Sequence, residues 1–491
     1  MSRRYFLAFD LGAESGRAVL GTLENETIAI RELHRFPNGP LELFGRLHWN
    51  IFSLFEDIKK GMKICASEIT DKPESLAVDT WGVDFGLLAK DGSILGLPYA
   101  YRDPRNIEAM EKFFKKFSRK KIYELTGIQF LPFNSLFQLY ALVLDQSPLL
   151  EAATDLLFMP DLFTYLLSGK KVTETTIAST SQLYNPRSKN WNEELFAGLG
   201  ISKSIMQKLL PPGTVIGKTL AALAQETSLE DVPVVATASH DTGSAVAAVP
   251  ASGKNWAYIS SGTWSLMGVE SPQPVITSRT LKSNFTNECG MEGTIRFLKN
   301  VTGLWLIQQC RKKWSANRHL SYDEMRAMAA SAPPFKAMID PDSADFLNPP
   351  DMPEAVQNFC RKTRQAVPAT PAETLRCVIE SLALKYRLVL EELKQISPHP
   401  IEKIHIIGGG SQHVTLCQFT ADATSLPVGA GPVEATAIGN IMGQALALGY
   451  VRSLGEIRAI VANSAELQTY EPRETKLWEA AYERFRTIVN K

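Results

Sequence analysis

A carboxylate, two glycines and several hydrogen-bond donors follow the first strand of the sequence. Residues 9–17 read FDLGAESGR, and apolar runs stand on both sides. Backbone N–H groups of such a turn can surround an anion, and the Ser15 hydroxyl and Arg17 guanidinium can add donors. Asp10 cannot bind a phosphate directly, but it can hold Mg²⁺ through water while the metal meets phosphate oxygens. A hairpin whose aspartate caps its own turn fits the same residues, so the turn alone leaves both interpretations open.

A second carboxylate stands where a strand ends and a helix of small residues begins. The apolar residues 234–238 are followed by Ser239-His240-Asp241-Thr242-Gly243. In α/β proteins, catalytic and ligand-binding residues are commonly found at the carboxyl ends of strands. A carboxylate there can take the proton of an attacking hydroxyl. The alternative is that Asp241 caps the helix that follows.

Two further turns have the residue types that contact a nucleotide. Ser260-Ser261-Gly262-Thr263 can donate to a phosphate, although a polar hairpin turn is the simpler explanation of this stretch alone. Gly408, Gly409 and Gly410 follow an apolar strand and precede a helix, whose N-terminus favours anions. The run is not the G-x-G-x-x-G dinucleotide fingerprint. Because a strand-to-helix turn needs only one glycine, three favour contact with a ligand, such as the nucleoside part of a nucleotide.

Aromatic and charged side chains gather between residues 79 and 103. The stretches VDTWGVDFGLL and YAYRDPRN contain Trp81, Tyr101, Asp79, Asp84 and Arg102. Sugars are bound by this mixture, with ring C–H groups against aromatic faces and hydroxyls on acids and amides. The alternatives are core aromatics, together with helix caps for Asp79, Asp84 and Asp103, and we expect at least two of these acids to be structural.

The elements that must position these turns form two similar halves. Residues 1–36 predict a three-stranded antiparallel meander, residues 51–62 have apolar side chains at helical spacing, and residues 105–230 are predicted to be mostly helical. Residues 255–270 again predict strand, polar turn and strand, and a long helix and an apolar strand come later. This pattern indicates duplication of one α/β unit, with a cleft between the copies as the site. The predicted boundary gives domains 1–248 and 249–491. In the helix expected from Pro432, the small residues Ala435, Gly439 and Gly443 are four apart, which indicates close helix packing.

Composition excludes several classes of protein. Of 491 residues, 52 are Lys or Arg and 52 are Asp or Glu, so no bulk charge attracts nucleic acid or an anionic membrane. No apolar run reaches the roughly 20 residues of a membrane span, and MSRRYFLAFD reaches an acid too early for a signal peptide. The six cysteines include no C-x-x-C pair, which predicts reduced thiols in a cytoplasm, with Cys360 and Cys377 more easily explained as free than as bridged. H-E-x-x-H and G-x-S-x-G are absent, which argues against metal-site and serine hydrolysis.

Taken in order, these turns resemble the FGGY family of carbohydrate kinases, in the actin/hexokinase-like (ribonuclease H-like) ATPase superfamily. The resemblance covers nearly the whole chain and rests on the blocks DLGAESGR, VDTWGVDF, YRDPR, SHDT, SSGTWSLMG, RFLKNVTGLWL, GGGSQ and AGPVEATAIGN. It implies an α/β fold of two duplicated ribonuclease H-like ATPase domains with a cleft between them. Sugar binding, the first phosphate turn and the catalytic base would belong to domain 1–248, and nucleotide binding to domain 249–491. Two blocks, DTWGVDF and LKNVTGLW, are most similar to the branch of the family that phosphorylates L-rhamnulose.

The resemblance assigns roles residue by residue. It implies transfer of a phosphoryl group from Mg·ATP to the C1 hydroxyl of L-rhamnulose in L-rhamnose catabolism, by a cytoplasmic monomer or homodimer without nucleic-acid or membrane partners. Asp241 would be the general base, and Asp10 would hold Mg²⁺ through water. ATP would contact Ala13, Glu14, Ser15, Gly16, Arg17, Thr263, Gln308, Gly409 and Gly410. The ketose would contact Gly82, His240, Asp241, Thr242 and Asn300, with Trp81 and Tyr101 as walls of its pocket.

Two places depart from the family pattern, and other functions stay open. Glu14 replaces a small hydroxyl residue, which bears on phosphate and metal contacts. Ser411 and His413 stand where relatives often have Cys and Asn, which bears on the adenine side. One alternative is a kinase of the same family for L-fuculose, D-xylulose or a related ketose. Others are a catalytically silent sugar or nucleotide sensor, which would be expected to lack Asp241 or the phosphate turns, and a chaperone-like ATPase.

Overall fold

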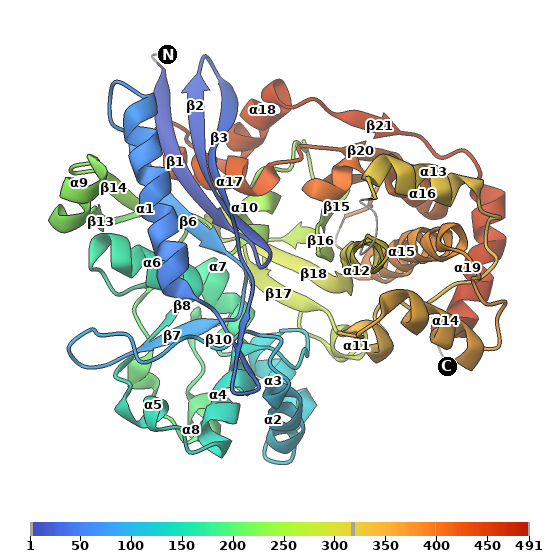
Figure 1. Cartoon of the computed structure of the whole chain (residues 1–491), viewed down its shortest axis with the longest axis horizontal. Helices are drawn as coiled ribbons and strands as arrows, with labels where there is room; N and C mark the ends of the chain where they lie inside the picture. Colours follow the sequence, from blue (N-terminus) through green and yellow to red (C-terminus); the bar gives the residue numbers. More distant parts are fainter. Residues whose placement is uncertain (1–2, 316–319, 398, 490–491) are drawn as a thin grey trace. The chain divides into compact units, whose positions relative to one another are not determined.

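The computed structural model describes residues 3–315, 320–397 and 399–489 (Figure 1). The chain forms two compact units, each assembled from three segments. Unit 1 consists of Met1–Ser252, Glu270–Phe297 and Ala435–Ser464, and unit 2 consists of Gly253–Val269, Leu298–Glu434 and Ala465–Lys491. The predicted boundary at residue 248 stays a prediction.

Unit 1 is built on a six-stranded mixed sheet. Its order is β13-β14-β6-β1-β2-β3, and the strands are β13 (Thr214–Lys218), β14 (Pro233–Ala236), β6 (Ser75–Thr80), β1 (Arg4–Leu11), β2 (Ser15–Glu24) and β3 (Thr27–Pro37). β1, β2 and β3 form an antiparallel meander, as predicted, while β6 runs parallel to both β1 and β14. The carboxyl ends of β1, β6 and β14 therefore meet at one edge of the sheet.

Helices cover both faces of this sheet (Figure 1). α1 (Ile51–Glu68), in the predicted place, packs so closely that a Cβ on Gly61 would lie 2.6 Å from the Ala18 methyl group. On the other face, a Cβ on Gly21 would lie 2.6 Å from Ile441 of α17 (Ala435–Ala447). Because side chains alternate along a strand, Asp10 belongs to the α17 face.

Small residues let α17 approach α10 (Asp241–Ala247), the helix that begins with the predicted base. A Cβ on Gly439 would lie 1.8 Å from the Ser244 carbonyl oxygen, and one on Gly443 would lie 2.2 Å from the Thr237 hydroxyl oxygen. The predicted packing role of this stripe is confirmed. The predicted start at Pro432 is wrong, because the helix begins at Ala435.

The segment between β6 and β14 mixes helices with short strands, so "mostly helical" describes it only in part. Strand β7 (Phe85–Leu88) pairs with β8 (Asp155–Phe158). The helices are α2 (Arg105–Phe114), α3 (Arg119–Thr126), α4 (Ser135–Leu144), α5 (Pro148–Ala152), α6 (Met159–Ser168), α7 (Thr175–Ala178), α8 (Glu193–Leu199) and α9 (Ala221–Thr227).

Unit 2 repeats the strand order of unit 1. Its strands follow the order β18-β16-β15-β19-β20-β21, which are β18 (Ile295–Thr302), β16 (Trp264–Ser271), β15 (Trp256–Ser261), β19 (Lys403–Ile407), β20 (Val428–Ala430) and β21 (Gln468–Tyr470). β15 pairs antiparallel with β16 and parallel with β19, as β1 does with β2 and β6. β17 (Thr286–Cys289) and the first residues of β18 belong to unit 1. The predicted duplication is thus a repeat of topology.

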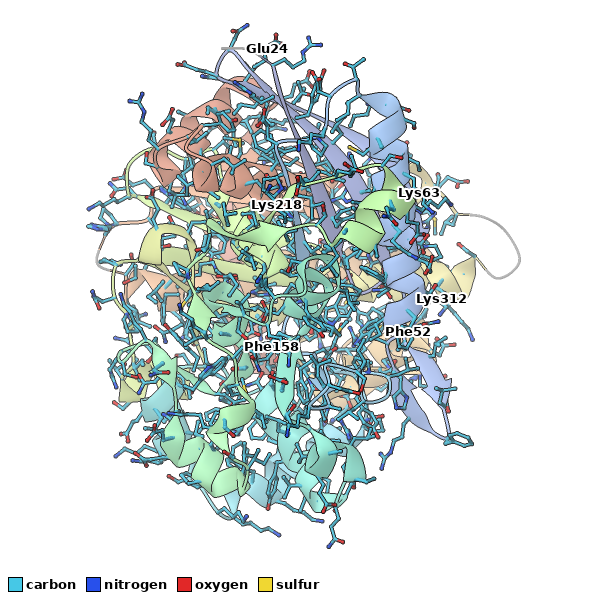
Figure 2. All side chains as sticks on the ribbon, turned by 90° about the vertical axis from the view of Figure 1, so that its left-hand side faces the viewer. Glu24, Phe52, Lys63, Phe158, Lys218 and Lys312 are labelled. Atoms are coloured by element: carbon cyan, nitrogen blue, oxygen red, sulfur yellow. The ribbon has the colours of Figure 1, made fainter. Side chains whose placement is uncertain are left out.

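Helices of unit 2 include the long α15 (Pro371–Lys394), which is completely helical as its sequence predicts. The others used below are α12 (Trp305–Trp314) and α16 (Val414–Thr424). Charged side chains such as Glu24, Lys63 and Lys218 lie at the surface, whereas Phe158 is buried (Figure 2). All six cysteines are buried and unbridged, as predicted. Within the described ranges, no helix combines the length and apolar character needed to cross a membrane.

Candidate active site

The turn between β1 and β2 is a tight loop tied down by a neighbouring asparagine. Gly12 N–H donates to the Ser15 carbonyl at 2.9 Å. Asn38 donates through its side chain to the Gly12 carbonyl at 2.7 Å and through its backbone to the Glu14 carbonyl at 3.0 Å. Glu14 is exposed. Neither glycine of the turn has a positive φ. Gly16 is required by packing instead, because a Cβ there would lie 2.2 Å from the Phe36 ring.

Asp10 and Arg17 form an ion pair at this turn. They are register partners in the β1–β2 ladder, so their side chains leave the same face. Arg17 donates to Asp10 Oδ2 from Nε at 3.1 Å and from Nη2 at 2.7 Å. Oδ1 receives neither bond, and the Asp10 side chain is 10% exposed. A carboxylate oxygen that is not used by Arg17 could bind a hard cation such as Mg²⁺ through water. Among the described residues, no group of three or more His, Cys, Asp or Glu could hold a metal by itself.

Asp79 lies beside Asp10 on the neighbouring strand. The two residues are register partners in the parallel β1–β6 ladder. Asp79 is fully buried and accepts a hydrogen bond from Asn440 Nδ2 of α17 at 2.6 Å. Burial, together with the negative charge of Asp10, raises the pKa of Asp79 well above its usual range. The buried environment of Asp79 therefore favours the protonated form of its carboxyl group.

Asp241 has one engaged and one available carboxylate oxygen. Oδ1 accepts from Thr242 N at 2.5 Å and Thr242 Oγ1 at 3.1 Å, and lies 3.2 Å from His240 Nε2. None of these contacts reaches Oδ2, and the side chain is 31% exposed. The capping interpretation is wrong, because the N-cap residue of α10 is His240 and Asp241 is the first residue of the helix. Asp241 Oδ1 is nevertheless occupied by the residue that follows it. Burial raises the pKa of Asp241, His240 opposes this, and the charge of Asp10 raises it further. Asp10, Asp79 and Asp241 therefore lie within electrostatic reach of one another in unit 1.

Backbone pairing brings the Gly82 loop to His240. Thr80 N–H donates to the Ser239 carbonyl at 2.9 Å, just beyond the ends of β6 and β14. A Cβ on Gly82 would lie 3.4 Å from His240 Nε2 and 3.3 Å from the Thr180 side chain. Among the predicted ketose contacts, Gly82, His240, Asp241 and Thr242 are thus brought together in unit 1, whereas Asn300 lies on β18 in unit 2.

The sequence did not reveal the role of Glu174, which binds the backbone just after the end of β14. Its buried carboxylate accepts from Ser239 N at 3.0 Å, Ser239 Oγ at 2.7 Å and Thr176 N at 2.6 Å. Thr176 Oγ1 in turn accepts from His240 N at 3.1 Å. No motif marks Glu174, because Thr176 is close in sequence but Ser239 is 65 residues away, and only the fold brings Ser239 to it.

Trp81 and Tyr101 surround a buried aspartate. Asp84 Oδ2 accepts from Trp49 Nε1 at 2.6 Å, Trp81 Nε1 at 2.9 Å and Tyr101 N at 3.1 Å. Burial raises the pKa of Asp84 to about 7, against the hydrogen bonds that stabilise its charge. Asp103 accepts from the backbone of Leu47 and Arg105. These two acids are structural, as the alternative predicted. Trp81 and Tyr101 are only 5% and 8% exposed, and their place in a ketose pocket stays a prediction.

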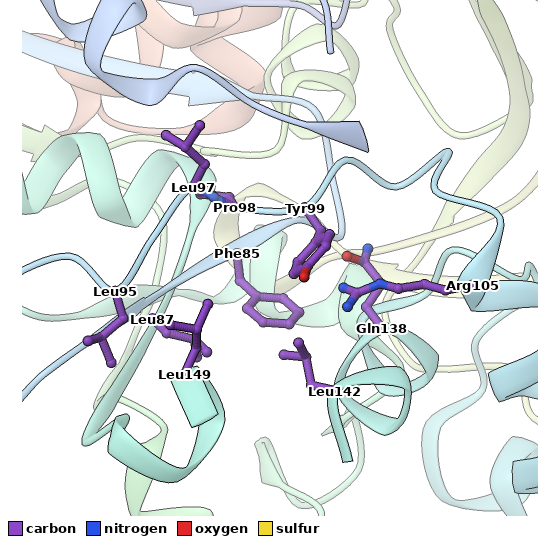
Figure 3. A pocket seen from close by; sticks show the side chains of 10 residues that line it. All are labelled: Phe85, Leu87, Leu95, Leu97, Pro98, Tyr99, Arg105, Gln138, Leu142 and Leu149. Carbon is purple, nitrogen blue, oxygen red and sulfur yellow. The ribbon is translucent and has the colours of Figure 1, made fainter. Parts of the chain in front are cut away.

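A small apolar pocket lies next to this aromatic group (Figure 3). The Arg105 guanidinium lies 3.4 Å from the centroid of the Tyr99 ring, and Gln138 stands beside it. The cavity measures about 20 Å³, which is room for one or two waters. It is too small for a ketose, so we do not assign the sugar to it.

In unit 2, the turn between β15 and β16 packs on the start of α12. Gly262 N–H donates to the Trp264 carbonyl at 2.8 Å, much as Gly12 does in unit 1. The Thr263 carbonyl accepts from Gly303 N and Trp305 N, each at 3.2 Å. Gln308 follows on α12, and its Oε1 is buried with no hydrogen-bond partner in the part of the chain that the structure describes.

The three glycines after β19 have different reasons to be glycine. Gly408 has φ +80°, and a Cβ on Gly410 would lie 2.0 Å from Ser261 Oγ. Gly409 is exposed, and a Cβ there would meet nothing within 4 Å. Backbone conformation explains the glycine at 408 and packing explains the glycine at 410. Of the three, only Gly409 has free space beside it that a ligand could occupy.

The two departures from the family pattern next to these glycines are structural. Ser411 Oγ donates to the Gly408 carbonyl at 2.7 Å, and His413 Nδ1 accepts from Leu416 N at 3.2 Å, which caps α16. Burial lowers the pKa of His413, in keeping with a neutral ring that accepts this bond.

Comparison with known proteins identifies the family of this chain. The N-terminal domain of the FGGY family of carbohydrate kinases matches residues 5–248, and its C-terminal domain matches residues 257–448. The chain belongs to this family of kinases. A rhamnulokinase from Bacteroides thetaiotaomicron is 48% identical over 99% of this chain and 100% of its own length. A rhamnulokinase from Enterococcus faecalis is 40% identical over 96% of this chain and 95% of its own.

Solved FGGY-type kinases share the fold at low sequence identity. A gluconate kinase from Lactobacillus acidophilus matches with a TM-score of 0.83 and 17% identity, over 100% of this chain and 98% of its own. A xylulose kinase from the same organism matches with a TM-score of 0.82 and 17% identity, over 99% and 98%. The predicted α/β fold of duplicated actin-like ATPase domains is confirmed.

Proposed function

We propose that this FGGY kinase is a rhamnulokinase, which transfers the γ-phosphoryl group of ATP to the C1 hydroxyl of L-rhamnulose. The products are L-rhamnulose 1-phosphate and ADP. Whole-length identity of 40% to 48% to curated rhamnulokinases supports the choice of ketose. The observation that carries the chemistry is Asp241, which keeps Oδ2 clear of its internal hydrogen bonds while Oδ1 is held.

In the proposed reaction, Asp241 Oδ2 accepts the C1 hydroxyl proton as the sugar oxygen attacks the γ-phosphorus. The new P–O bond forms in line with the bond that breaks to release ADP. Burial and the nearby Asp10 raise the pKa of Asp241, so it is a stronger base than an ordinary aspartate. Most of the rate gain would come from positioning and charge stabilisation, since the transition state is loose.

We assign the ATP phosphates to the turn 13–17 and to Thr263, and the rest of the nucleotide to Gln308, Gly409 and Gly410. The unpartnered Gln308 Oε1 and the open surface at Gly409 support this. Asp10 would hold Mg²⁺ through water, and bound Mg²⁺ would neutralise charge on the phosphate oxygens. Gly82, His240, Thr242 and Asn300 would contact the ketose, with Trp81 and Tyr101 behind them. We place the enzyme in the cytoplasm as a monomer or homodimer.

The test is ATP turnover with a panel of ketoses, detected as ADP in a coupled assay. We expect kcat/KM for L-rhamnulose to exceed that for L-fuculose and D-xylulose by at least about tenfold. A preference for another ketose would retain the kinase and replace the substrate. No turnover with any ketose, alongside measurable ATP binding, would favour the catalytically silent sensor.

A further inference from the structure

A buried ion pair lies behind His240, on the side away from Asp241. Arg296 is fully buried, and its Nη2 lies 3.1 Å from Glu288 Oε2 and 3.0 Å from His240 Nδ1. Arg296 Nε donates to the Cys289 carbonyl at 2.9 Å, which fixes the guanidinium in place. The other ring nitrogen, His240 Nε2, lies 3.2 Å from Asp241 Oδ1. These residues all belong to unit 1 and form a chain of contacts from Glu288 to the proposed base.

The chemistry of arginine decides which ring nitrogen carries the proton. A guanidinium has only donors and stays charged in proteins. His240 Nδ1, at 3.0 Å from Arg296 Nη2, must therefore be an acceptor without a hydrogen. A neutral ring then has its hydrogen on Nε2, which is the nitrogen that faces Asp241. His240 thus donates to Asp241 Oδ1.

Two carboxylates facing His240 favour a doubly protonated ring, namely Asp241, whose Oδ1 lies 3.2 Å from Nε2, and Glu288. Glu288 Oε2 lies 3.4 Å from Nδ1, and a doubly protonated ring could donate there. Burial acts to raise the pKa of Glu288, but Arg296 and His240 outweigh it and the net pKa is lowered, so Glu288 is ionised and holds Arg296. A second cation at 3.0 Å from Arg296 would be repelled by it, which favours the neutral ring.

We propose that Arg296 is a positioning residue that holds His240 in its Nε2–H form. In this form His240 donates to Oδ1 of Asp241, and Oδ2 is left to take the proton of the sugar hydroxyl. The catalytic part of the proposal rests on the proposed kinase function. The protonation part does not, because it concerns the ring of His240 in the protein without substrates.

The first test is the nitrogen spectrum of the His240 ring in ¹⁵N-histidine-labelled protein. The signal is identified by its loss in His240→Gln, among the 7 histidines of the chain. We expect Nδ1 to resonate as an unprotonated nitrogen and Nε2 as a protonated one at neutral pH. An Nδ1–H form, or an imidazolium, in the unaltered protein would overturn the proposal whatever its activity.

The second test removes the ion pair without leaving a bare buried charge, in the double variant Arg296→Met with Glu288→Gln. We expect the Nε2–H form to be no longer the main form of the ring. We expect kcat to fall about tenfold with little change in the KM for ATP, and the acid limb of the pH profile to move to higher pH. The upward movement follows because Asp241 loses a donor that stabilises its charge. The single variant Arg296→Lys retains a donor near Nδ1 and should recover part of kcat.

The matched control is Arg376→Met with Glu380→Gln, another arginine–glutamate pair, in which Glu380 is fully buried and Arg376 is partly buried, with an Nε–Oε1 distance of 2.5 Å on α15. It should lower the thermal midpoint without changing the His240 signal or the pH profile. If the Arg296 variants lower only the thermal midpoint as well, Arg296 is structural and the proposal is wrong. If all forms lack kinase activity while the ring has the Nε2–H form, the proposed function has failed and the protonation state stands.

Discussion

The two units have the same strand order and different chemistry at the same positions. Asp10 and Asp79 are register partners near the ends of β1 and β6 in unit 1. The corresponding partners on β15 and β19 in unit 2 are Ser260 and Ile407. Unit 1 thus gathers carboxylates that can handle protons and a cation, whereas unit 2 offers hydroxyls, backbone N–H groups and one open glycine. The same sheet topology thus occurs in both units, but the side chains at the ends of the strands differ, and so does the chemistry that each unit can perform.

The largest effect on kcat should come from a change of Asp241, which lies in unit 1 after the end of β14. Asp241→Asn should lower kcat by at least about a hundredfold, because an amide cannot take the hydroxyl proton. The amide can still accept at the position of Oδ1, so we expect the fold to be retained. Turnover is measured with the preferred ketose, and ATP binding and the melting curve serve as controls. Near-normal turnover would show that Asp241 of unit 1 is not the group that accepts the proton.

The pH profile tests the same carboxylate without a mutation. In the proposed mechanism Asp241 must be ionised, so kcat/KM should fall as pH drops through the pKa of this group in the free enzyme. Because burial and Asp10 raise that pKa, the acid limb should lie above the usual aspartate value of about 3.9. An acid limb at or below that value would contradict the environment described for Asp241.

In unit 2, two adjacent glycines separate packing from ligand contact. Gly410→Ala should destabilise the fold by about 1–3 kcal/mol, because its Cβ would lie 2.0 Å from Ser261 Oγ. Gly409→Ala, which meets nothing within 4 Å, should leave the melting temperature nearly unchanged and raise the KM for ATP a few-fold. Denaturant unfolding and ATP titration of both variants make each the control of the other. If the two variants changed stability and the KM for ATP equally, Gly409 could not be assigned to contact with the nucleotide.

The smallest effect should come from Asp79, an acid of unit 1 that is fully buried. Its pKa is raised in the folded state, so its contribution to stability is present below the unfolded-state pKa and is lost as pH rises. Asp79→Asn keeps an acceptor for Asn440 and removes this loss, so we expect a gain of about 1–2 °C in melting temperature at neutral pH. The gain should vanish toward pH 4. A lower melting temperature at neutral pH would show that Asp79 is ionised and stabilising.

Much of the fold could be predicted because the signals are local. The meander of residues 1–36, the helix α1 and the glycine stripe of α17 follow from alternation, helical spacing and small side chains, and all were found. The start of α17 at Pro432 was misplaced, since a proline is compatible with a helix start without requiring one. The reason for a glycine at position 16 could not be predicted, because the Phe36 ring that excludes a Cβ there is 20 residues away in the chain.

By itself, the sequence determined that Asp241 follows a strand, that three glycines follow another, and that the chain has kinase-family blocks in order. Contacts that the sequence does not reveal are the hydrogen bonds of two tryptophans to Asp84, the burial that raises the pKa of Asp79, and the approach of Arg296 to His240. The physical reason is that hydrogen bonding and desolvation depend on neighbours in space. For His240 and Arg296 those neighbours are 56 residues apart in the chain.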